Sequence, residues 1–246
     1  MVKFYSTIYT YDYSFPAVSL AYFLRYPNPY SRHVASTDTI DRHYDPETGR
    51  LTTVRLHLKR SRIPTAVLKL IPRSTLGAGE DGKTQSFILE KSVVDPREGW
   101  METESKNLDW NNVLSVIERH RYSRPEQQVG GTAAAAWQED RTDVAISVTL
   151  KSRIGEQIRR RRARWGEQAT GASVTGGEEE APKSKGWLSQ WGSGAMRTAI
   201  ETISLQRTEK SQPKAQLGMT VVLERLRSGG LREVLEGMRR DREVEI

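Results

Sequence analysis

Hydrophobic and polar side chains alternate through several segments of the first 150 residues. The clearest case is 143–150, where Val144, Ile146, Val148 and Leu150 fall on one side and small or polar residues on the other. A period of two is typical of a β-strand whose two faces meet different surroundings. About seven such strands in hairpin-like succession predict one antiparallel sheet. The other strand-forming segments are 3–10, 33–44, 51–62, 83–95, 100–110 and 113–124.

Hydrophobic positions with helical spacing occur in two parts of the chain. Residues 15–24 carry apolar side chains three and four apart, with Pro16 in the first turn, where proline is tolerated. The same spacing returns in 195–227, where we expect Pro213 to kink or interrupt the helix. A short amphipathic helix at 231–240 follows two glycines. A strand, a helix, many antiparallel strands and a long helix are the pattern of an α+β domain.

The composition narrows the classes of function. The chain of 246 residues carries 38 Lys and Arg against 31 Asp and Glu, a formal net charge of +7. This excess favours phosphate-bearing partners: nucleic acids, nucleotides or lipid head groups. Cysteine is absent, which excludes disulfide scaffolds, thiolate zinc sites, iron–sulfur clusters and cysteine nucleophiles. No uncharged apolar window approaches the roughly 19 residues of a spanning helix, so we expect no membrane insertion.

A basic run and a low-complexity stretch interrupt the periodic pattern. The arginine run at 159–164 could bind nucleic acid or an anionic membrane, or it could be a solvated basic segment. Residues 168–185 are rich in Gly, Ala and Glu, a composition typical of a disordered chain. We therefore expect one domain at 1–227 with a disordered insert around 163–194. An amphipathic C-terminal tail at 228–246 follows.

Residues 77–84 match, letter for letter, a phosphate-binding motif of nucleotide enzymes. In that motif Lys83 would contact phosphate oxygens and Thr84 a magnesium ion. Glu80 and Asp81 would place two carboxylates against the phosphates, and the following residues alternate like a strand where a helix is required. We therefore favour a Gly-rich loop and keep a nucleotide-dependent enzyme as a third hypothesis.

Other catalytic and metal-binding signatures are missing from the sequence. The four histidines lie at scattered spacings, and neither an H-E-x-x-H zinc motif nor a G-x-S-x-G nucleophile elbow occurs. We predict that the protein is not an enzyme and holds no metal ion.

An apolar segment at 63–76 is bracketed by prolines and flanked by cations. Prolines make it a poor strand. It is either a turn helix that caps the core or a mobile apolar lid, and an apolar loop beside basic residues suits a surface that touches lipid. The lid residues of this hypothesis are Ile63, Pro64, Val67, Leu68 and Leu70.

A specific run, RYPNPYSRHV, lies at 25–34 inside the longer stretch 22–42. It closely resembles the PRELI-like (MSF) family of phospholipid-transfer proteins of the mitochondrial intermembrane space. Its form is closer to the phosphatidic-acid branch than to the phosphatidylserine branch. The likeness covers most of residues 1–150 and again about 196–227. It continues in LTTVRLHLKRSRIPT at 51–65, ILEKSVVDP at 88–96, KNLDW at 106–110 and LGMTVVLERL at 217–226.

The resemblance implies a helix-grip (START-like) fold, in which a curved antiparallel sheet wraps a long C-terminal helix and encloses a lipid cavity. It implies a carrier that moves phosphatidic acid from the outer to the inner mitochondrial membrane for cardiolipin synthesis. The expected partners are a small twin-cysteine-motif helical protein and, transiently, anionic membranes, with no cofactor and no nucleic acid. Segment 63–76 matches the family's lid loop. The matching head-group residues are Arg25, His33, Lys59, Arg62, Arg207 and Lys214.

Strand parity sets one condition on this assignment. It places Lys59 on the same face as Arg55 and His57, opposite the apolar Val54 and Leu56. If the apolar face lines the cavity, Lys59 reaches a phosphate only at the twisted end of its strand. The leading hypothesis remains a lipid carrier. The runner-up is a nucleic-acid- or anion-binding adaptor that acts through the arginine run at 159–164.

Overall fold

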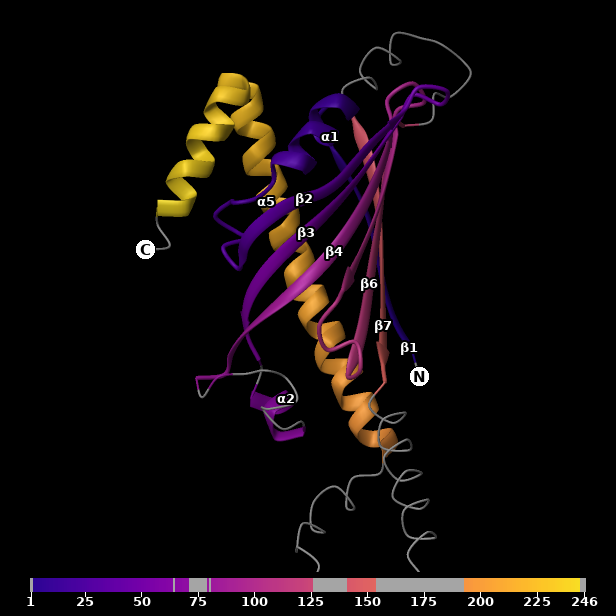
Figure 1. Ribbon diagram of the computed structural model, residues 1–246, viewed down its shortest axis with the longest axis vertical. Coiled ribbons are helices and arrows are strands. Elements are labelled where there is room, and N and C mark those ends of the chain that lie inside the picture. Colours follow the sequence, from indigo (N-terminus) through magenta and orange to yellow (C-terminus); the bar gives the residue numbers. More distant parts are fainter. Residues whose placement is uncertain are drawn as a thin grey trace, which may run out of the picture.

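The computed structural model describes residues 2–63, 65–70, 79, 81–125, 141–153 and 193–243. These residues form one seven-stranded antiparallel sheet of order β1-β7-β6-β5-β4-β3-β2, and helix α5 runs along one of its faces (Figure 1). The predicted α+β helix-grip architecture is confirmed. The strands are β1 (Val2–Tyr11), β2 (Val34–Asp45), β3 (Arg50–Arg62), β4 (Lys83–Asp95), β5 (Trp100–Asn107), β6 (Leu114–Ser123) and β7 (Thr142–Ser152), and the helices are α1 (Phe15–Leu24), α2 (Thr65–Leu70) and α5 (Ser193–Glu243).

Two hairpins of the sheet turn on the same short motif, D-P-x-x-G. It occurs at 45–49 between β2 and β3 and at 95–99 between β4 and β5. In both turns the glycine N–H donates to the aspartate carbonyl, and the glycine φ is +71° at Gly49 and +74° at Gly99. A glycine occupies this left-handed region without the steric cost of a Cβ. The repeated motif therefore fixes where two pairs of strands reverse.

The apolar face of β7 forms the centre of the main core. Val144, Ile146, Val148 and Leu150 are buried, as their alternation predicts. They belong to one cluster with residues of α1, of α5 and of the neighbouring strands. The further members of that cluster are Tyr11, Phe15, Val18, Ala21, Tyr22, Val94, Met101, Tyr122, Met219, Val222, Leu223 and Val234.

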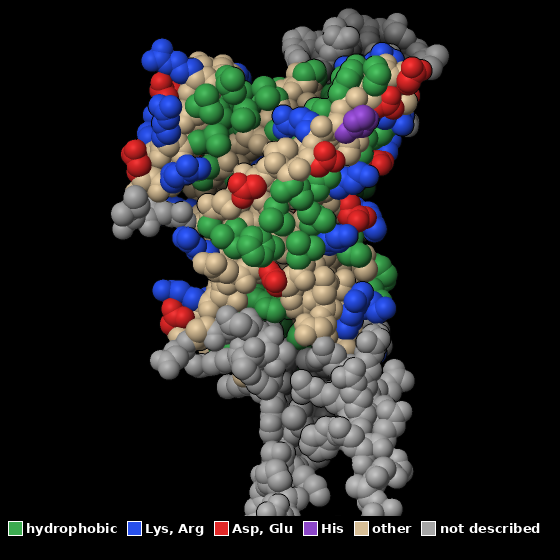
Figure 2. Space-filling model, in the orientation of Figure 1, with side chains coloured by type: hydrophobic (Ala, Val, Ile, Leu, Met, Phe, Trp, Pro, Cys, Tyr) green, Lys and Arg blue, Asp and Glu red, His purple; other side chains and the backbone are tan. Residues whose placement is uncertain are grey.

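Strand β3 presents its polar side chains to the interior, whereas β7 presents its apolar ones. Arg55 and His57 are buried, whereas Val54 and Leu56 are only partly covered. Hydrophobic side chains gather in the middle of the face shown in Figure 2, over the strands that lie in front in Figure 1. The condition that the apolar face lines the cavity is therefore not met on β3. Lys59 shares the inner, polar face with Arg55 and His57.

A buried carboxylate binds the end of α1 to the sheet. Glu90 of β4 lies 2.5 Å (Oε2–Nη2) from Arg25, which follows α1, and 2.5 Å (Oε1–Nη2) from Arg55 of β3. His57 Nε2 lies 3.3 Å from Oε2, and Arg55 also donates to the carbonyl of Phe23. Burial alone would raise the pKa of Glu90, but the charges of Arg25 and Arg55, with a hydrogen bond from His57, hold it well below its ordinary range.

Helix α5 passes through Pro213 and breaks at Gly230 instead. Of the two effects expected at Pro213, an interruption does not occur, because this exposed residue lies inside a continuous helical segment, whereas a kink stays a prediction. Gly230 has φ 63° and ψ −152°, and the chain then folds back as a second helical segment (Figure 1). Arg225 before the break pairs with Asp241 after it (Nη1–Oδ2 2.7 Å). Val234 is buried in the main core, so the predicted tail packs against the domain.

Several sequence expectations lie outside the described residues. They are the arginine run at 159–164 and all but the last two positions of the insert at 163–194. Within the described ranges, no helix has the length and apolar character that crossing a membrane requires.

We expect Glu90→Gln to lower the free energy of unfolding by about 3–5 kcal/mol, because two largely buried guanidinium groups lose their carboxylate. Denaturation in urea measures this loss. Glu104→Gln is the matched control, since Glu104 forms an exposed pair with Arg119 whose removal costs at most about 1 kcal/mol. Equal losses in the two variants would contradict the structural role of Glu90.

Candidate functional site

A cavity of about 690 Å³ lies between the inner face of the sheet, the segment after α1 and the middle of α5. All six basic residues predicted as head-group ligands line it. They come from three separate parts of the chain: Arg25 and His33 from the α1–β2 segment, Lys59 and Arg62 from β3, and Arg207 and Lys214 from α5. The fold thus brings the six together, and their role in binding stays a prediction.

The β3 side of the cavity carries a layer of cations near its mouth. Lys59 is half-buried on the inner face, and Arg62 is the last residue of the strand. His33 directly precedes β2, and its carbonyl accepts a hydrogen bond from the Arg60 N–H at 2.7 Å. This bond pairs the start of β2 with the end of β3, so that His33 stands beside the cationic end of β3.

Helix α5 presents a second row of cations to the same cavity. Arg207 and Lys214 are seven residues apart, about two turns of a helix, and Lys210 lies between them on the same face. Sequence reasoning missed Lys210, although its spacing of three from Arg207 and four from Lys214 could have found it. It also missed Arg60, which lines the cavity although it alternates with Lys59.

Most of these cations lack an anionic partner. Within the described part of the chain, Lys59, Arg62, Arg207, Lys210 and Lys214 form no ion pair with a carboxylate. Like charges held together in this way repel one another, and the repulsion is relieved by a bound anion. These cations are therefore available to an anion that enters the cavity.

His33 reports the same excess of positive charge. The residue remains exposed at its surface, but partial desolvation of the ring and the charges of Lys59 and Arg207 lower its pKa from the ordinary 6.5 to about 4. At neutral pH the ring is uncharged. His33 thus offers a neutral imidazole beside two cations.

Arg25 differs from the other predicted ligands because its charge is already shared. Its guanidinium binds Glu90 and the carbonyl of Tyr22, and it stacks over the Tyr22 ring at 3.7 Å from the centroid. Two guanidinium groups, from Arg25 and Arg55, face the single carboxylate of Glu90. The cluster therefore still carries a net positive charge into the cavity wall.

One carboxylate inside the cavity was not anticipated. Glu118 of β6 lines the cavity, and its Oε1 accepts hydrogen bonds from His120 Nε2 (2.7 Å) and from Gln212 Nε2 of α5 (2.8 Å). Burial alone would raise its pKa, but these two bonds and the nearby charge of Lys59 hold it at about 2. Glu118 is therefore ionised at neutral pH.

The predicted lid begins with a short helix that packs on a small separate core. Val67 and Leu68 of α2 contact a cluster formed by buried Ile63, Val113 and Ile200. Trp110 and Leu114 cover the same cluster. Of the other lid residues, Pro64 and the side chain of Leu70 lie outside the described residues.

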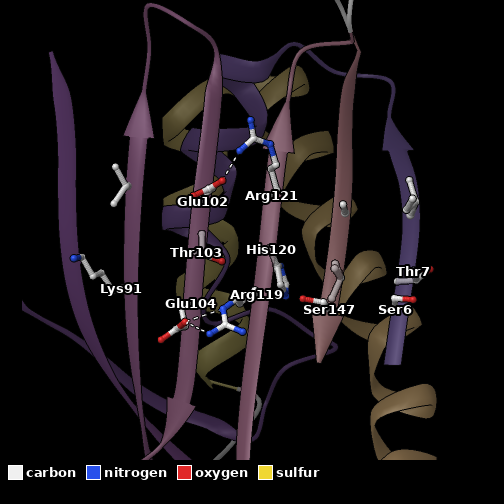
Figure 3. Close-up of a pocket in the computed structure, with 14 residues that line it drawn as sticks. Ser6, Thr7, Lys91, Glu102, Thr103, Glu104, Arg119, His120, Arg121 and Ser147 are labelled. Carbon is white, nitrogen blue, oxygen red and sulfur yellow. Dashed lines mark hydrogen bonds and ion pairs between the residues drawn. The ribbon is translucent and has the colours of Figure 1, made fainter. Parts of the chain in front are cut away.

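A second hollow, of about 1030 Å³, lies on the outer face of the sheet (Figure 3). Two of its three Lys and Arg side chains are paired with carboxylates: Arg119 with Glu104 at 2.7 Å, and Arg121 with Glu102. Only Lys91 lacks such a partner among the described residues of this hollow, whereas Lys59, Arg62, Arg207, Lys210 and Lys214 all lack one in the inner cavity, so the inner cavity is the candidate site.

The structure does not support a nucleotide site at 77–84. Lys83 is the first residue of β4, and its ammonium group lies 3.2 Å from Asp81. The motif requires a helix at this point, whose N-terminus would face the phosphates. The third hypothesis is therefore wrong on the geometry of the strand that follows. Among the described residues, no group of three His, Asp or Glu is placed to hold a metal ion.

Comparison with known proteins identifies several relatives of this chain. The mitochondrial protein UPS1 of Saccharomyces cerevisiae is 39% identical over 122 residues, which cover 50% of this chain and 64% of the relative. The ups1 homolog of Schizosaccharomyces pombe is 39% identical over 119 residues, covering 48% and 63%. The mitochondrial PRELI domain-containing protein 1 of Mus musculus is 31% identical over 150 residues, covering 61% and 63%. The chain thus spans just under two thirds of the length of each.

Solved structures give weaker likenesses. The ZhuI aromatase/cyclase from Streptomyces sp. R1128 aligns with a TM-score of 0.44 at 10% identity, over 94% of this chain and all of its own. The structure of Ara h 8.0201 aligns with a TM-score of 0.41 at 11% identity, over 91% of this chain and 99% of its own. At these scores the alignments carry no argument about function.

The family assignment rests on the sequence. The model of the PRELI-like family matches residues 16–161, more than half of the chain. The matched region contains all but the first residue of α1, the sheet from β2 to β7, and four of the six predicted head-group residues. The relative from Mus musculus carries the family's name. This chain therefore belongs to the PRELI-like family.

Proposed function

We propose that this protein is a lipid carrier that binds phosphatidic acid in the inner cavity and transfers it between membranes. The observation that carries the proposal is the group of cations without carboxylate partners around one cavity. Lys59 and Arg62 stand on the sheet side, and Arg207 and Lys214 stand on the helix side. A phosphate held between them would relieve the repulsion among these cations.

The chemistry of a phosphate monoester fits this arrangement. It carries about −1.5 to −2 charges at pH 7 and three acceptor oxygens, so it needs two or more cationic donors. Arginine supplies a planar, bidentate fork, and lysine supplies a compact point charge. The cavity offers one of each kind from two elements, Lys59 and Arg62 from β3 and Arg207 and Lys214 from α5.

The deeper wall of the cavity suits the apolar part of a lipid. Tyr9, Tyr122, Ile146 and Met219 line it, and they belong to or border the main core. Each CH₂ group that leaves water for such a wall is stabilised by about 0.8 kcal/mol. A carrier of this kind needs no cofactor and makes or breaks no covalent bond.

The relatives' names support the proposed place of action. UPS1 and PRELI domain-containing protein 1 are both named as mitochondrial proteins. We assign the chain to the mitochondrial intermembrane space, where it would carry phosphatidic acid from the outer to the inner membrane for cardiolipin synthesis. A small twin-cysteine-motif helical protein is the proposed partner, and contact with anionic membranes is transient.

We expect the reversals Lys59→Glu and Arg207→Glu to slow phosphatidic-acid transfer between vesicles by at least about tenfold each, because a carboxylate would then face the phosphate. Lys91→Glu is the matched control, since Lys91 lies on the outer face of β4 (Figure 3). Transfer is measured with labelled lipid. Equal slowing by Lys91→Glu would show that only the net charge matters.

The adaptor hypothesis is separated by a further reversal, Arg160→Glu with Arg161→Glu. If the lipid carrier is correct, this double variant keeps its bound lipid and loses only salt-sensitive docking to anionic vesicles. Loss of bound lipid in this variant, with the cavity variants unaffected, would make the basic run the functional site.

The pH dependence of His33 supplies an independent test. In the lipid-free protein its pKa of about 4 lies below the ordinary 6.5, so the unfolded chain binds the proton first and the free energy of unfolding falls as pH drops from 6.5 toward 4. A phosphate bound beside the ring favours the charged imidazolium, so loading with phosphatidic acid should raise this pKa. NMR titration of the imidazole measures it. The same pKa with and without lipid would argue against a phosphate at this position.

For the lid we expect the double variant Val67→Asp with Leu68→Asp to lose bound lipid faster than the wild type. Two carboxylates cannot remain in the apolar cluster around Ile63, so α2 should leave it. Thr65→Asp is the control, because Thr65 is exposed on the same helix. Dissociation of a labelled lipid from the loaded protein is the measurement, and unchanged dissociation in the double variant would remove α2 from the retention mechanism.

A further inference from the structure

One carboxylate in the cavity, that of Glu118, has an oxygen without a hydrogen-bond partner among the described residues. Oε1 of Glu118 accepts the bonds from His120 and Gln212, but Oε2 makes no hydrogen bond or ion pair with the described residues. The side chain is 29% exposed and lines the cavity, so Oε2 opens into it. A free acceptor therefore stands among the cations that attract an anion.

Glu118 differs in this respect from the other acid of the cavity wall. Glu90 has both oxygens bound, Oε1 by Arg55 and Oε2 by Arg25. Among the described residues that line the cavity, Glu118 is the one carboxylate with an oxygen left for a ligand. Its position is fixed from two sides, since Gln212 is buried on α5 and His120 stands two residues along β6.

An ionised carboxylate only accepts hydrogen bonds, so it discriminates between phosphate groups that carry a hydrogen-bond donor and those that do not. A phosphate that brings its own O–H or N–H donor forms a charge-assisted hydrogen bond to Oε2. A phosphate without a donor places two anions side by side in a site of low polarity, and their repulsion opposes the attraction of Lys59. Because Lys59 is close enough to Glu118 to lower its pKa, a phosphate beside Lys59 meets both the attraction of the lysine and the repulsion of the carboxylate.

We propose that Glu118 sets the head-group selectivity of the cavity, admitting an anionic phosphate that carries a hydrogen-bond donor and rejecting one that carries none. The inference rests on the proposed function. In phosphatidic acid the donor is the hydroxyl of the singly protonated phosphate monoester, the minor form at pH 7 because the second pKa is about 6, and a carboxylate beside the phosphate selects this form. In phosphatidylserine the donor is the ammonium group. Phosphatidylmethanol carries the phosphate charge with no donor.

The test compares these three lipids in otherwise identical phosphatidylcholine vesicles. We expect the wild type to transfer phosphatidic acid about tenfold or more faster than phosphatidylmethanol, because a hydrogen bond to a charged group discriminates by that order. Glu118→Gln should raise phosphatidylmethanol transfer and bring the ratio to within about threefold, since the new amide donates to a phosphate oxygen. The phosphatidylserine arm tells an ammonium donor from a phosphate hydroxyl.

The control is Glu104→Gln, the same substitution on the outer face of β5, which should leave every ratio unchanged. An unchanged phosphatidic-acid to phosphatidylmethanol ratio in Glu118→Gln, with phosphatidic acid still transferred, would overturn the selectivity role alone. Should that variant not fold, the wild type decides: equal transfer of the two lipids overturns the role without any variant. A wild type that transfers none of the three would overturn the proposed function and this inference together.

Discussion

The ion pairs of the Glu90 carboxylate with Arg25 and Arg55 are the interactions on which the packing of α1 against the sheet depends. Glu90 sits on β4, and its two guanidinium partners come from the end of α1 and from β3, so one anion holds the helix against the sheet. The partners outnumber it, which leaves positive charge in the wall next to Lys59. The same group thus stabilises the fold locally and gives the cavity its sign. A buried ion cluster of this kind tolerates no loss of a single member.

The cavity wall combines a polar and an apolar part. Strands β3 and β4 contribute His57, Lys59 and Glu90, whereas β1, β6 and β7 contribute the rings of Tyr9 and Tyr122 and the side chain of Ile146. An amphipathic cargo has the same division, with a charged head and hydrocarbon chains. The division follows from strand parity, because β3 and β7 present residues of opposite character to the same interior.

Much of the fold could be predicted from the sequence. The alternation in β7, the D-P-x-x-G turn at 45–49 and the run at 25–34 each depend on residues close together in the chain, and local patterns of this kind decide strands and reversals. The inward polar face of β3 could not be predicted, since it depends on Glu90, thirty-five residues from Arg55, being available as a partner. The continuity of the helix through Pro213 could not be predicted, because proline removes one N–H and local propensity alone favours an end there. The place of Glu118 in the cavity could not be predicted for a similar reason, because its side chain is positioned by Gln212 on a helix far along the chain.

The fold-back of α5 at Gly230 also has a mechanical meaning. The Arg225–Asp241 pair and buried Val234 clamp one end of the long helix, and buried Ile200 fixes the other beside the lid cluster. Arg207, Lys210 and Lys214 lie between the two fixed ends and span about 10 Å along a rigid rod. Their backbone positions cannot shift one at a time toward a head group. Any movement of the sheet relative to α5 changes the distance to Lys59 for all three residues at once. Binding and release of the head group are therefore expected to be cooperative rather than graded.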